Sequence, residues 1–304
     1  MDKFHEAIEI FKMGSHMSLN YQDRPIVVTY SGGKDSQVLL EVAKASGEPF
    51  EVWNNHTSVD APQTVQFIRN EFKKLDEQGI KCVVDYPRYK DGTQITMWNL
   101  IPRNGVPPTR LMRYCCKNFK ERGCGDRVIA TGVRWDESTQ RQSRMQYETV
   151  ASRKDLRTGA TYEMMLSNDN DDKRQIIEQC KLKGKIVCNP IIALTDTEIW
   201  DIIHDNKLNY NPLYDIGYER VGCVGCPEAK KCEKKKQFKD FPTYKRAYIR
   251  AFDKMIDIRK SKGLYTQWEN GEECFLWWVE DQNIEGQLFF DEYMNIGQGN
   301  INLY

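Results

Sequence analysis

A short glycine turn followed by charged residues is the part of this sequence best suited to chemistry. The apolar run 25–30 stops at S-G-G-K-D-S, residues 31–36, and apolar residues then recur at helical spacing. Glycines let a backbone approach a phosphate closely, and the amides that open a helix favour negative charge, to which Lys34 adds a full positive charge. The spacing is that of neither a Walker loop nor a dinucleotide fingerprint. The segment therefore predicts another kind of anion site, and a tight turn with a solvated lysine is the alternative.

Two arginines further along the chain are of a type that binds phosphate or sulfate. Arg134 follows the apolar run 127–132, and Arg141 lies seven residues later. A guanidinium group binds such anions through paired hydrogen bonds. We therefore predict that both arginines face the anion. The alternative is that they form surface ion pairs with Asp136 or Glu137.

Five of the ten cysteines are spaced like metal ligands. Cys115 and Cys116 are adjacent in the sequence. Far downstream, Cys223 and Cys226 form a C-x-x-C pair, and Cys232 follows six residues later. C-x-x-C is a chelating spacing for iron–sulfur clusters and for zinc. An iron–sulfur cluster, a zinc ion and no metal are three open interpretations, and Cys232 is an alternative ligand in place of Cys115.

These residues have to be positioned by the ends of buried strands. Most of the five short β-rich runs are continuously apolar, which is typical of strands buried on both faces of a parallel sheet. The runs are residues 26–30, 50–54, 82–86, 127–132 and 185–189. Helical patterns at 35–46 and 60–76 lie between them. The alternation predicts an α/β doubly wound domain, in which ligands bind at the carboxyl ends of the strands.

The pattern divides the chain into three regions. We assign residues 1–20 to an N-terminal helix, residues 21–194 to the α/β domain, and residues 195–304 to a helical C-terminal region that carries the C-x-x-C segment. Within the α/β domain, residues 136–178 are polar, charged and poor in large aliphatic side chains. Long segments of this kind in compact domains are usually functional or disordered, so we expect an excursion from the sheet here.

The segment 31–36 resembles the PP-loop of the ATP pyrophosphatases. Further segments extend the likeness to the phosphoadenylyl-sulfate (PAPS) reductase family: NNHTSVDAPQTVQFI, TGVRWDESTQR, NPIIALTDTEIWDII and NPLYDIGYERVGCVGC. The resemblance covers residues 21–232 in the order of that family. It implies a five-stranded, mostly parallel sheet with the nucleotide at the carboxyl ends of the strands.

The resemblance also implies roles for individual residues. An adenine nucleotide is expected to lie against Ser31, Gly32, Gly33, Lys34, Asp35, Ser36, Thr57, Gly132 and Arg134. The residues expected to be catalytic are Lys34, Asp35, Arg134 and Arg141. ATP pyrophosphatases cleave the bond between the α- and β-phosphates, which implies Mg²⁺ to neutralise the leaving pyrophosphate.

The cysteines resemble two motifs of the family to different degrees. The iron–sulfur branch, the adenylyl-sulfate reductases, holds a 4Fe–4S cluster with a C-C…C-x-x-C set, matched here by Cys115, Cys116, Cys223 and Cys226. Family reductases attack sulfur with the cysteine of an E-C-G-[LI]-H motif. Cys274 stands instead in G-E-E-C-F-L-W-W, without the glycine and the histidine. We therefore predict that Cys274 is a core residue, with a nucleophile as the alternative.

These observations lead to a prediction and two alternatives. We predict a PP-loop enzyme that binds Mg·ATP, releases pyrophosphate and supports sulfur transfer, with the 4Fe–4S cluster as structural support or sulfur relay. The complete S-G-G-K-D-S loop favours this, because family reductases usually carry a degraded loop, and the combination is similar to sulfur-transfer proteins of DNA phosphorothioation systems. The first alternative is a PAPS or adenylyl-sulfate reductase that uses Cys274 or a partner thiol. The second is a non-catalytic nucleotide-sensing or nucleic-acid-binding adaptor.

Charge and hydropathy bear on partners and location. The 44 Lys and Arg balance 44 Asp and Glu, so overall charge indicates no partner. Residues 228–262 are locally basic, thirteen against five, with Tyr244, Tyr248 and Phe252 at helical spacing. This predicts either a helix with aromatic residues in the core or a basic face for nucleic acid. We also expect a sulfur-donor or thiol-donor protein and a homo-oligomer. No run resembles a secretory signal or approaches the ~18 residues of a membrane span, so we expect a cytoplasmic protein without a membrane partner.

Overall fold

The computed structural model describes residues 2–120, 123–124, 127–137, 141–142, 144–150 and 185–280. The chain divides into two compact units, and each is described by itself. Unit 1 comprises residues 1–95 and 114–223, and unit 2 comprises residues 96–113 and 224–304. Unit 1 thus continues past residue 194, where the sequence analysis placed the end of the α/β domain. None of the helices in the described part of the chain is long and apolar enough to cross a membrane.

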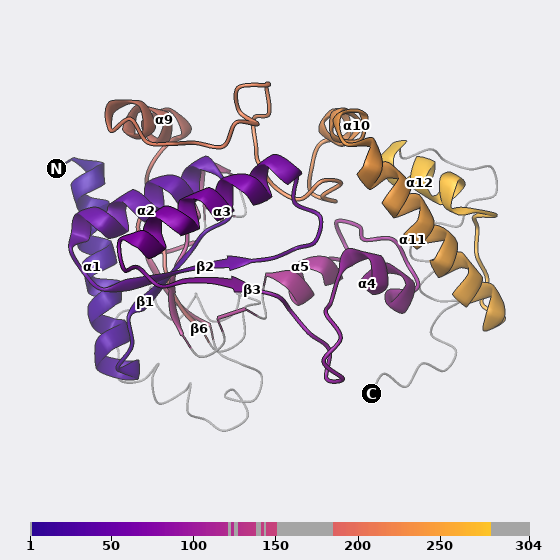
Figure 1. The fold of residues 1–304 in the computed structure, drawn as a ribbon, viewed down its shortest axis with the longest axis horizontal. Helices are drawn as coiled ribbons and strands as arrows, with labels where there is room; N and C mark the ends of the chain where they lie inside the picture. The colour runs from indigo at the N-terminus through magenta and orange to yellow at the C-terminus, as the bar shows by residue number, and fades with distance from the viewer. Residues whose placement is uncertain are drawn as a thin grey trace. The chain divides into compact units, whose positions relative to one another are not determined.

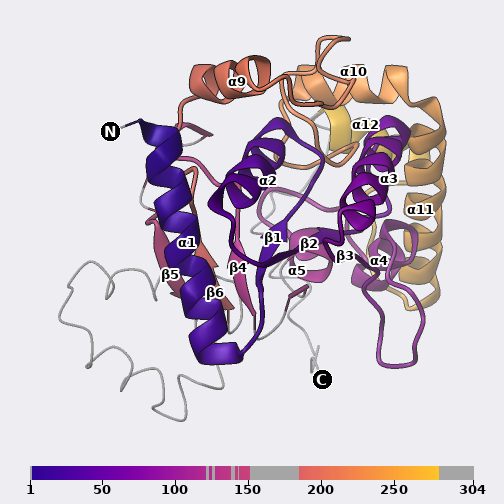
Figure 2. The same ribbon diagram turned by 60° about the vertical axis from the view of Figure 1, so that its left-hand side comes forward.

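The described part of unit 1 contains a six-stranded sheet in the order β3-β2-β1-β4-β6-β5 (Figures 1 and 2). Its strands are β1 (Ile26–Thr29), β2 (Phe50–Asn55), β3 (Cys82–Asp85), β4 (Val128–Ala130), β5 (Tyr147–Val150) and β6 (Lys185–Cys188). Neighbouring strands are parallel except that β5 is antiparallel to β6. The five parallel strands confirm the predicted ones. Strand β5 was not predicted, because its residues stand within the polar segment 136–178.

The order of the strands determines where a ligand can bind. Strand β1 pairs with β2 on one side and with β4 on the other. The chain therefore leaves β1 toward one edge of the sheet and later returns to its other side. In open α/β sheets such a reversal opens a crevice at the carboxyl ends of the two strands. The segments that follow β1 and β4 are residues 31–36 and 131–137.

Helices of unit 1 cover the sheet and fix these loops. They are α1 (Lys3–Gln22), α2 (Lys34–Ser46), α3 (Pro62–Glu77), α5 (Tyr114–Phe119), α9 (Asp196–Asp205) and the short 3₁₀ helix η1 (Trp135–Glu137). As predicted, α2 buries Val38, Leu39 and Val42 completely. Helix α9 joins the same core through Ile199 and Ile203. The helix therefore belongs to the unit that carries the loops, although the sequence analysis had assigned it to the C-terminal region.

Helix α1 covers the predicted N-terminal helix and packs against α2, β1 and β4 (Figure 2). A Cβ atom on Gly14 would lie 2.9 Å from Sγ of Cys188 and 3.1 Å from Cδ1 of Ile26. Only a glycine allows the helix to approach the sheet this closely. Helix α1 is therefore closely packed against the sheet as part of the α/β core.

Unit 2 is helical and built around aromatic side chains. Its helices are α4 (Met97–Asn104), α10 (Lys231–Asp240), α11 (Pro242–Ser261) and α12 (Gly271–Glu280). Trp278 lies at the centre, with ring centroids of Tyr248 and Phe252 at 4.7 and 5.4 Å. Both Tyr248 and Phe252 are buried. Tyr248 and Phe252 of the basic segment thus lie in the core, as the first of the two interpretations predicted, whereas Tyr244 is half-buried.

Candidate functional site: the loop between β1 and α2

The backbone of residues 31–36 is shaped to present amides. Gly32 has a φ of +74°, and a Cβ atom there would lie 2.9 Å from Cγ1 of Ile68. Gly33 is the N-cap of α2 and gives the helix no side-chain cap. The hydroxyl of Ser36 donates to the Gly33 carbonyl at 2.8 Å, which closes the turn. Gly33 therefore leaves the first amides of α2 without a cap from its own side chain, and binding of an anion to them stays a prediction.

Two residues that the sequence analysis did not single out hold this loop in place. The amide of Lys34 donates to the phenol oxygen of Tyr214 at 3.0 Å. The side-chain amide of Asn211 donates to the Gly32 carbonyl at 3.2 Å and to Thr64 Oγ1 at 3.1 Å. Burial raises the pKa of Tyr214 to about 12, so the phenol stays neutral. Both residues stand in the N-P-L-Y segment. The resemblance of this segment to the PAPS reductase family was the only feature of the sequence analysis that could have pointed to them.

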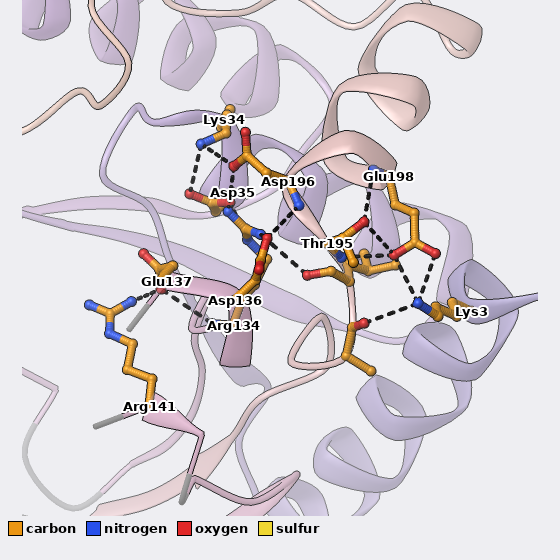
Figure 3. A network of polar contacts seen from close by, with 12 residues as sticks. Lys3, Lys34, Asp35, Arg134, Asp136, Glu137, Arg141, Thr195, Asp196 and Glu198 are labelled. Atoms are coloured by element: carbon orange, nitrogen blue, oxygen red, sulfur yellow. Dashed lines mark hydrogen bonds and ion pairs between the residues drawn. The ribbon is translucent and has the colours of Figure 1, made fainter. Parts of the chain in front are cut away.

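Arg134 is the centre of a polar network and is almost completely buried (Figure 3). Its Nε donates to Oδ1 of Asp35 at 2.6 Å, and its Nη1 donates to the Leu194 carbonyl at 3.2 Å. Its Nη2 donates to Oδ1 of Asp196 at 2.9 Å. The alternative of a surface salt bridge is therefore excluded by burial, although Asp136 also lies 3.6 Å from Nη1.

Lys34 joins the same network from the first turn of α2. Its Nζ lies 2.9 Å from Oδ1 of Asp196 and 3.9 Å from Oδ2 of Asp35. The Lys34 side chain is 8 % exposed, so it is not a solvated lysine. Burial tends to raise the pKa of Asp196, but hydrogen bonds and charges from Lys34 and Arg134 outweigh it, and the pKa lies below its ordinary value. Asp196 was not predicted as a site residue.

Gly132 serves the site through close packing. A Cβ atom at this position would lie 3.3 Å from the carbonyl carbon and oxygen of Asp35 and 3.4 Å from the amide nitrogen of Ser36. Gly132 is the second residue after β4, so it lets the loop after β4 touch the first turn of α2. It thereby places the turn that carries Asp35 next to Arg134.

Arg141 lies at the edge of the site. It forms an ion pair with Glu137, which was the alternative that the sequence left open (Figure 3). Burial and then the charges of Arg220 and Arg144 lower the pKa of Arg141 to about 10, and Asp35 acts in the opposite direction. The positive charge of Arg134 also lowers the pKa of Arg141. Arg144 and Arg220 were not predicted.

Thr57 lies at the carboxyl end of β2, the strand beside β1. It is buried, and its Oγ1 accepts a hydrogen bond from the Val59 amide at 3.3 Å. The Thr57 amide donates to the Asp60 carboxylate at 3.4 Å. The residue thus stabilises the loop after β2, and a contact with nucleotide stays a prediction.

The predicted metal ligands are divided between the two units. Cys115 and Cys116 lie in α5, and Cys223 pairs with Asp60 in an isolated antiparallel bridge, all within unit 1. Cys226 and Cys232 belong to unit 2. None of these five cysteines forms a disulfide. Among the described residues, no three Cys, His, Asp or Glu side chains come together as a group that could hold a metal ion.

The turn inside the C-x-x-C pair is nevertheless held in one conformation by side chains of unit 2. Gly225 has a φ of +73°, and a Cβ atom there would lie 2.7 Å from Phe238 and 2.8 Å from Trp278. Its amide donates to Oε1 of Gln237 at 2.8 Å, and the Tyr248 hydroxyl donates to the Val224 carbonyl at 3.0 Å. The backbone that carries Cys226 is therefore fixed on the aromatic core.

Cys274 is a core residue. It lies on α12, is completely buried, and burial followed by the charge of Asp253 raises the pKa of its thiol well above the ordinary value. A buried thiol of this kind is a poor nucleophile. The interpretation of Cys274 as core is therefore favoured by the structure. Cys180 lies outside the described residues.

Comparison with known proteins identifies a family domain in this chain. Residues 25–229 match the family described as the Phosphoadenosine phosphosulfate reductase domain. An uncharacterized protein of Methanocaldococcus jannaschii is 26 % identical over 258 residues, 85 % of this chain, and the chain spans 53 % of that protein's length. An adenosine 5′-phosphosulfate reductase of Bacillus cereus is 25 % identical over 214 residues, covering 67 % of this chain and 74 % of the reductase.

Likeness to solved structures is more distant. The PAPS reductase of Candida auris, solved as a phosphate complex, has a TM-score of 0.44 and 16 % identity, covering 72 % of this chain and 88 % of that one. The match to the family domain is the decisive comparison, because it extends over most of the chain, from the residue before β1 to beyond Cys226. This chain belongs to the phosphoadenosine phosphosulfate reductase domain family.

Proposed function

We propose that this protein is a PP-loop enzyme that cleaves the α–β phosphate bond of ATP, releases pyrophosphate and supports sulfur transfer in the cytoplasm. One observation carries the proposal. The cations of Lys34 and Arg134 converge on one carboxylate oxygen beside the start of α2, where the N-cap Gly33 has no side chain to cap the helix. Two buried cations at a helix N-terminus, at the switch point of a parallel sheet, suit the phosphate tail of a nucleotide.

The charge balance of this network indicates how nucleotide enters it. Lys34 and Arg134 are already paired with Asp35 and Asp196. A triphosphate has to displace one carboxylate or arrive with a cation. The Asp196 side chain is 54 % exposed against 22 % for Asp35. Asp196 is therefore the carboxylate that moves, and its oxygens are of the type that Mg²⁺ prefers.

The reaction is a displacement at the α-phosphorus. A nucleophile of the acceptor forms a bond to that phosphorus, and the bond to the oxygen that bridges the α- and β-phosphates breaks. Pyrophosphate leaves with the electron pair. Lys34, Arg134 and the α2 amides stabilise the charge that develops on it. Arg141 adds positive charge at the edge of the site, close to Asp35.

The cysteine set fits an iron–sulfur cluster in its chemistry. The ligands would be Cys115, Cys116, Cys223 and Cys226, with Cys232 as the alternative to Cys115. None of them is in a disulfide, and Gly225 shapes the turn that separates Cys223 from Cys226. The cluster, when bound, supplies structural support or a relay for sulfur. The sulfur comes from a donor protein, and the acceptor is separate from the nucleotide.

A reductase is the second candidate, and it is favoured by the family match and by the similarity to adenosine 5′-phosphosulfate reductases. Because Cys274 is completely buried, such a reductase would take its thiol from a partner protein. Nucleic acid is proposed as a further partner through the exposed lysines and arginines of 228–262. Tyr248 and Phe252 of that segment are buried and Tyr244 is half-buried, so binding would depend on phosphate contacts and weaken steeply with salt.

The test compares two ligands on anaerobically purified full-length protein. Pyrophosphate release from Mg·ATP and equilibrium binding of PAPS are measured side by side, with the visible spectrum of the same sample. We expect pyrophosphate from ATP, together with broad absorbance near ~400 nm from an iron–sulfur centre. Tight binding of PAPS without release of pyrophosphate would contradict the proposal and favour the reductase.

Matched variants locate the activity. Asp35→Asn keeps the shape of the side chain, removes the charge that pairs with Arg134, and is expected to abolish pyrophosphate release. Asp201→Asn makes the same chemical change at an exposed position of α9 and is expected to have no effect. Equal activity of the two variants would place any ATP cleavage outside this loop.

A further inference from the structure

A second site that the proposed function does not use lies within unit 2. A cavity of about 250 Å³ is lined by Pro108, Thr109, Arg110, Pro227, Ala229, Lys231, Lys234, Trp277 and Trp278. All of these residues belong to unit 2. The cavity is smaller than the roughly 300–1,000 Å³ of pockets for drug-sized ligands. It therefore suits one small molecule or the end of a larger one.

The charged residues around this cavity are all of one sign. Arg110, Lys231 and Lys234 line it, and none of its described lining residues is acidic. Lys234 is 8 % exposed, with its Nζ 3.4 Å from the Trp278 carbonyl and 5.8 Å from the centre of the Trp278 ring. The positive charges of Arg110, Lys231 and Lys234 favour an anionic ligand in this cavity.

The position of the cavity on α10 adds to its preference for anions. Lys231 and Lys234 are one turn apart on this helix, and Lys231 is its first residue. The N-cap residue, Lys230, makes no side-chain hydrogen bond to the amides of the first turn. Arg110 is held at the cavity because its Nε donates to the Pro227 carbonyl at 3.3 Å.

Two indole rings form the other wall. Trp278 is fixed by packing and by its Nε1, which donates to the Pro108 carbonyl at 2.6 Å. Trp277 is half-buried and packs against Trp268 with ring centroids 5.0 Å apart. A rigid, partly exposed indole beside cations can stack on a flat ring that carries a negative group.

We propose that this cavity is a binding site for a nucleoside 5′-monophosphate unit, with Arg110, Lys231 and Lys234 at the phosphate and Trp277 against the base. The unit comes either from a free nucleotide or from the phosphorylated 5′ end of a nucleic-acid strand. The described lining residues of this cavity belong to unit 2 and the loop between β1 and α2 belongs to unit 1, so the two proposals rest on different residues.

The test uses full-length protein in which the first site is blocked by Gly33→Val. Binding of AMP is measured by titration calorimetry and compared with adenosine, which lacks the phosphate, and ribose 5-phosphate, which lacks the base. We expect AMP to bind at least tenfold more tightly than either fragment. Binding of AMP no tighter than of both fragments would overturn the proposal.

Variants at the exposed Lys231 and at the half-buried Trp277 assign the binding to this cavity. Lys231→Glu is expected to weaken AMP binding at least tenfold, and Trp277→Leu to remove the preference for AMP over ribose 5-phosphate. Lys239→Glu makes the same charge reversal on the same helix, outside the cavity, and should leave affinity unchanged. Equal losses for Lys231→Glu and Lys239→Glu would show that only overall charge matters, and would overturn the site.

A third arm separates the two sources of the ligand. A short oligodeoxynucleotide is titrated with and without a 5′ phosphate. A nucleic-acid end is the source if the phosphorylated strand binds more tightly than AMP and loses this advantage in Lys231→Glu. A free nucleotide is the source if AMP binds and the 5′ phosphate makes no difference to the strand.

Discussion

The ammonium group of Lys34 and the guanidinium group of Arg134 share a single oxygen, Oδ1 of Asp196, each at 2.9 Å. The two residues are 100 positions apart in the chain and reach this oxygen from the loops after β1 and β4. A carboxylate thus occupies the position between two cations that a phosphate oxygen would take. This arrangement keeps the cations together in the free protein, where they would otherwise repel each other.

Replacing Asp196 should strengthen the binding of a metal-free anion. In Asp196→Asn the two cations lose a competing charge while the side chain keeps its shape. We expect inorganic pyrophosphate to bind about tenfold more tightly in the presence of a chelator, which is roughly 1.4 kcal/mol. Titration calorimetry measures this. The matched variant Asp201→Asn on the same helix should bind like the unaltered protein, and weaker binding by Asp196→Asn would contradict the role of a displaceable carboxylate.

Gly132→Ala should damage the site more than the fold. The added methyl would lie 3.3 Å from the Asp35 carbonyl, so the first turn of α2 has to shift by a few tenths of an ångström. We expect a loss of about 1–3 kcal/mol in the free energy of unfolding, and a fall in pyrophosphate release of tenfold or more, since misplacement of such groups is costly. Denaturant unfolding and the pyrophosphate assay check the two effects, and unchanged release would refute the packing argument.

Two glycines beside the C-x-x-C pair allow a matched test of the cluster. Gly225→Ala needs an unfavourable positive φ and places a methyl 2.7 Å from Phe238, whereas a Cβ atom on Gly222 meets nothing within 4 Å. We expect anaerobically purified Gly225→Ala to lose most of its iron and acid-labile sulfide, and Gly222→Ala to retain them. Equal iron content in both variants would mean that the turn does not determine cluster binding.

The pH dependence of stability should contain a contribution from Glu198. Hydrogen bonds from Lys3 and then from the Thr195 amide lower the pKa of this carboxyl from 4.5 to about 2. A lowered pKa stabilises the fold above the unfolded value of 4.5, and the contribution disappears as pH falls toward 2. Glu198→Gln should therefore be less stable than the unaltered protein at pH 7 and approach it below pH 3. Urea unfolding at several pH values measures the difference in the free energy of unfolding between the two proteins. A difference that does not change with pH would contradict a lowered pKa of Glu198.

Cys274 should be inert in the folded protein. It is completely buried, and the pKa of its thiol is raised by burial. We expect an alkylating reagent to modify it only in denaturant, as read by mass spectrometry of peptides, and Cys274→Ala to retain pyrophosphate release within about twofold. Fast labelling of Cys274 in the native protein, together with loss of activity in Cys274→Ala, would restore it as a nucleophile.

The local parts of the fold could be predicted from the sequence, because each depends on a short pattern. Continuous apolar runs marked the five parallel strands, and the glycine turn marked the start of α2. Strand β5 was missed because Y-E-T-V pairs with β6 inside an otherwise polar segment. Asp196 was missed for another reason. Its role depends on Lys34 and Arg134, and long-range convergence of this kind leaves no periodicity in the sequence.

The division of the cysteines between the two units also could not be predicted from a local sequence pattern. Cys223 and Cys226 are three residues apart, yet they belong to different units, because the chain crosses between units at residues 223 and 224. Sequence spacing treats such a pair as one local motif. The boundary is determined by packing of Val224 and Gly225 onto distant aromatic side chains, which no short window contains.

The hydrogen bonds from Asn211 and to Tyr214 have a consequence for synthesis of the protein. These side chains hold Gly32 and Lys34 but follow them by about 180 residues, near the end of unit 1. A nascent chain emerging from the ribosome therefore lacks both of these hydrogen bonds until almost all of unit 1 has been translated. Nucleotide affinity should appear late and abruptly in a series of arrested nascent chains, between those that expose residues up to 205 and those that expose residue 223.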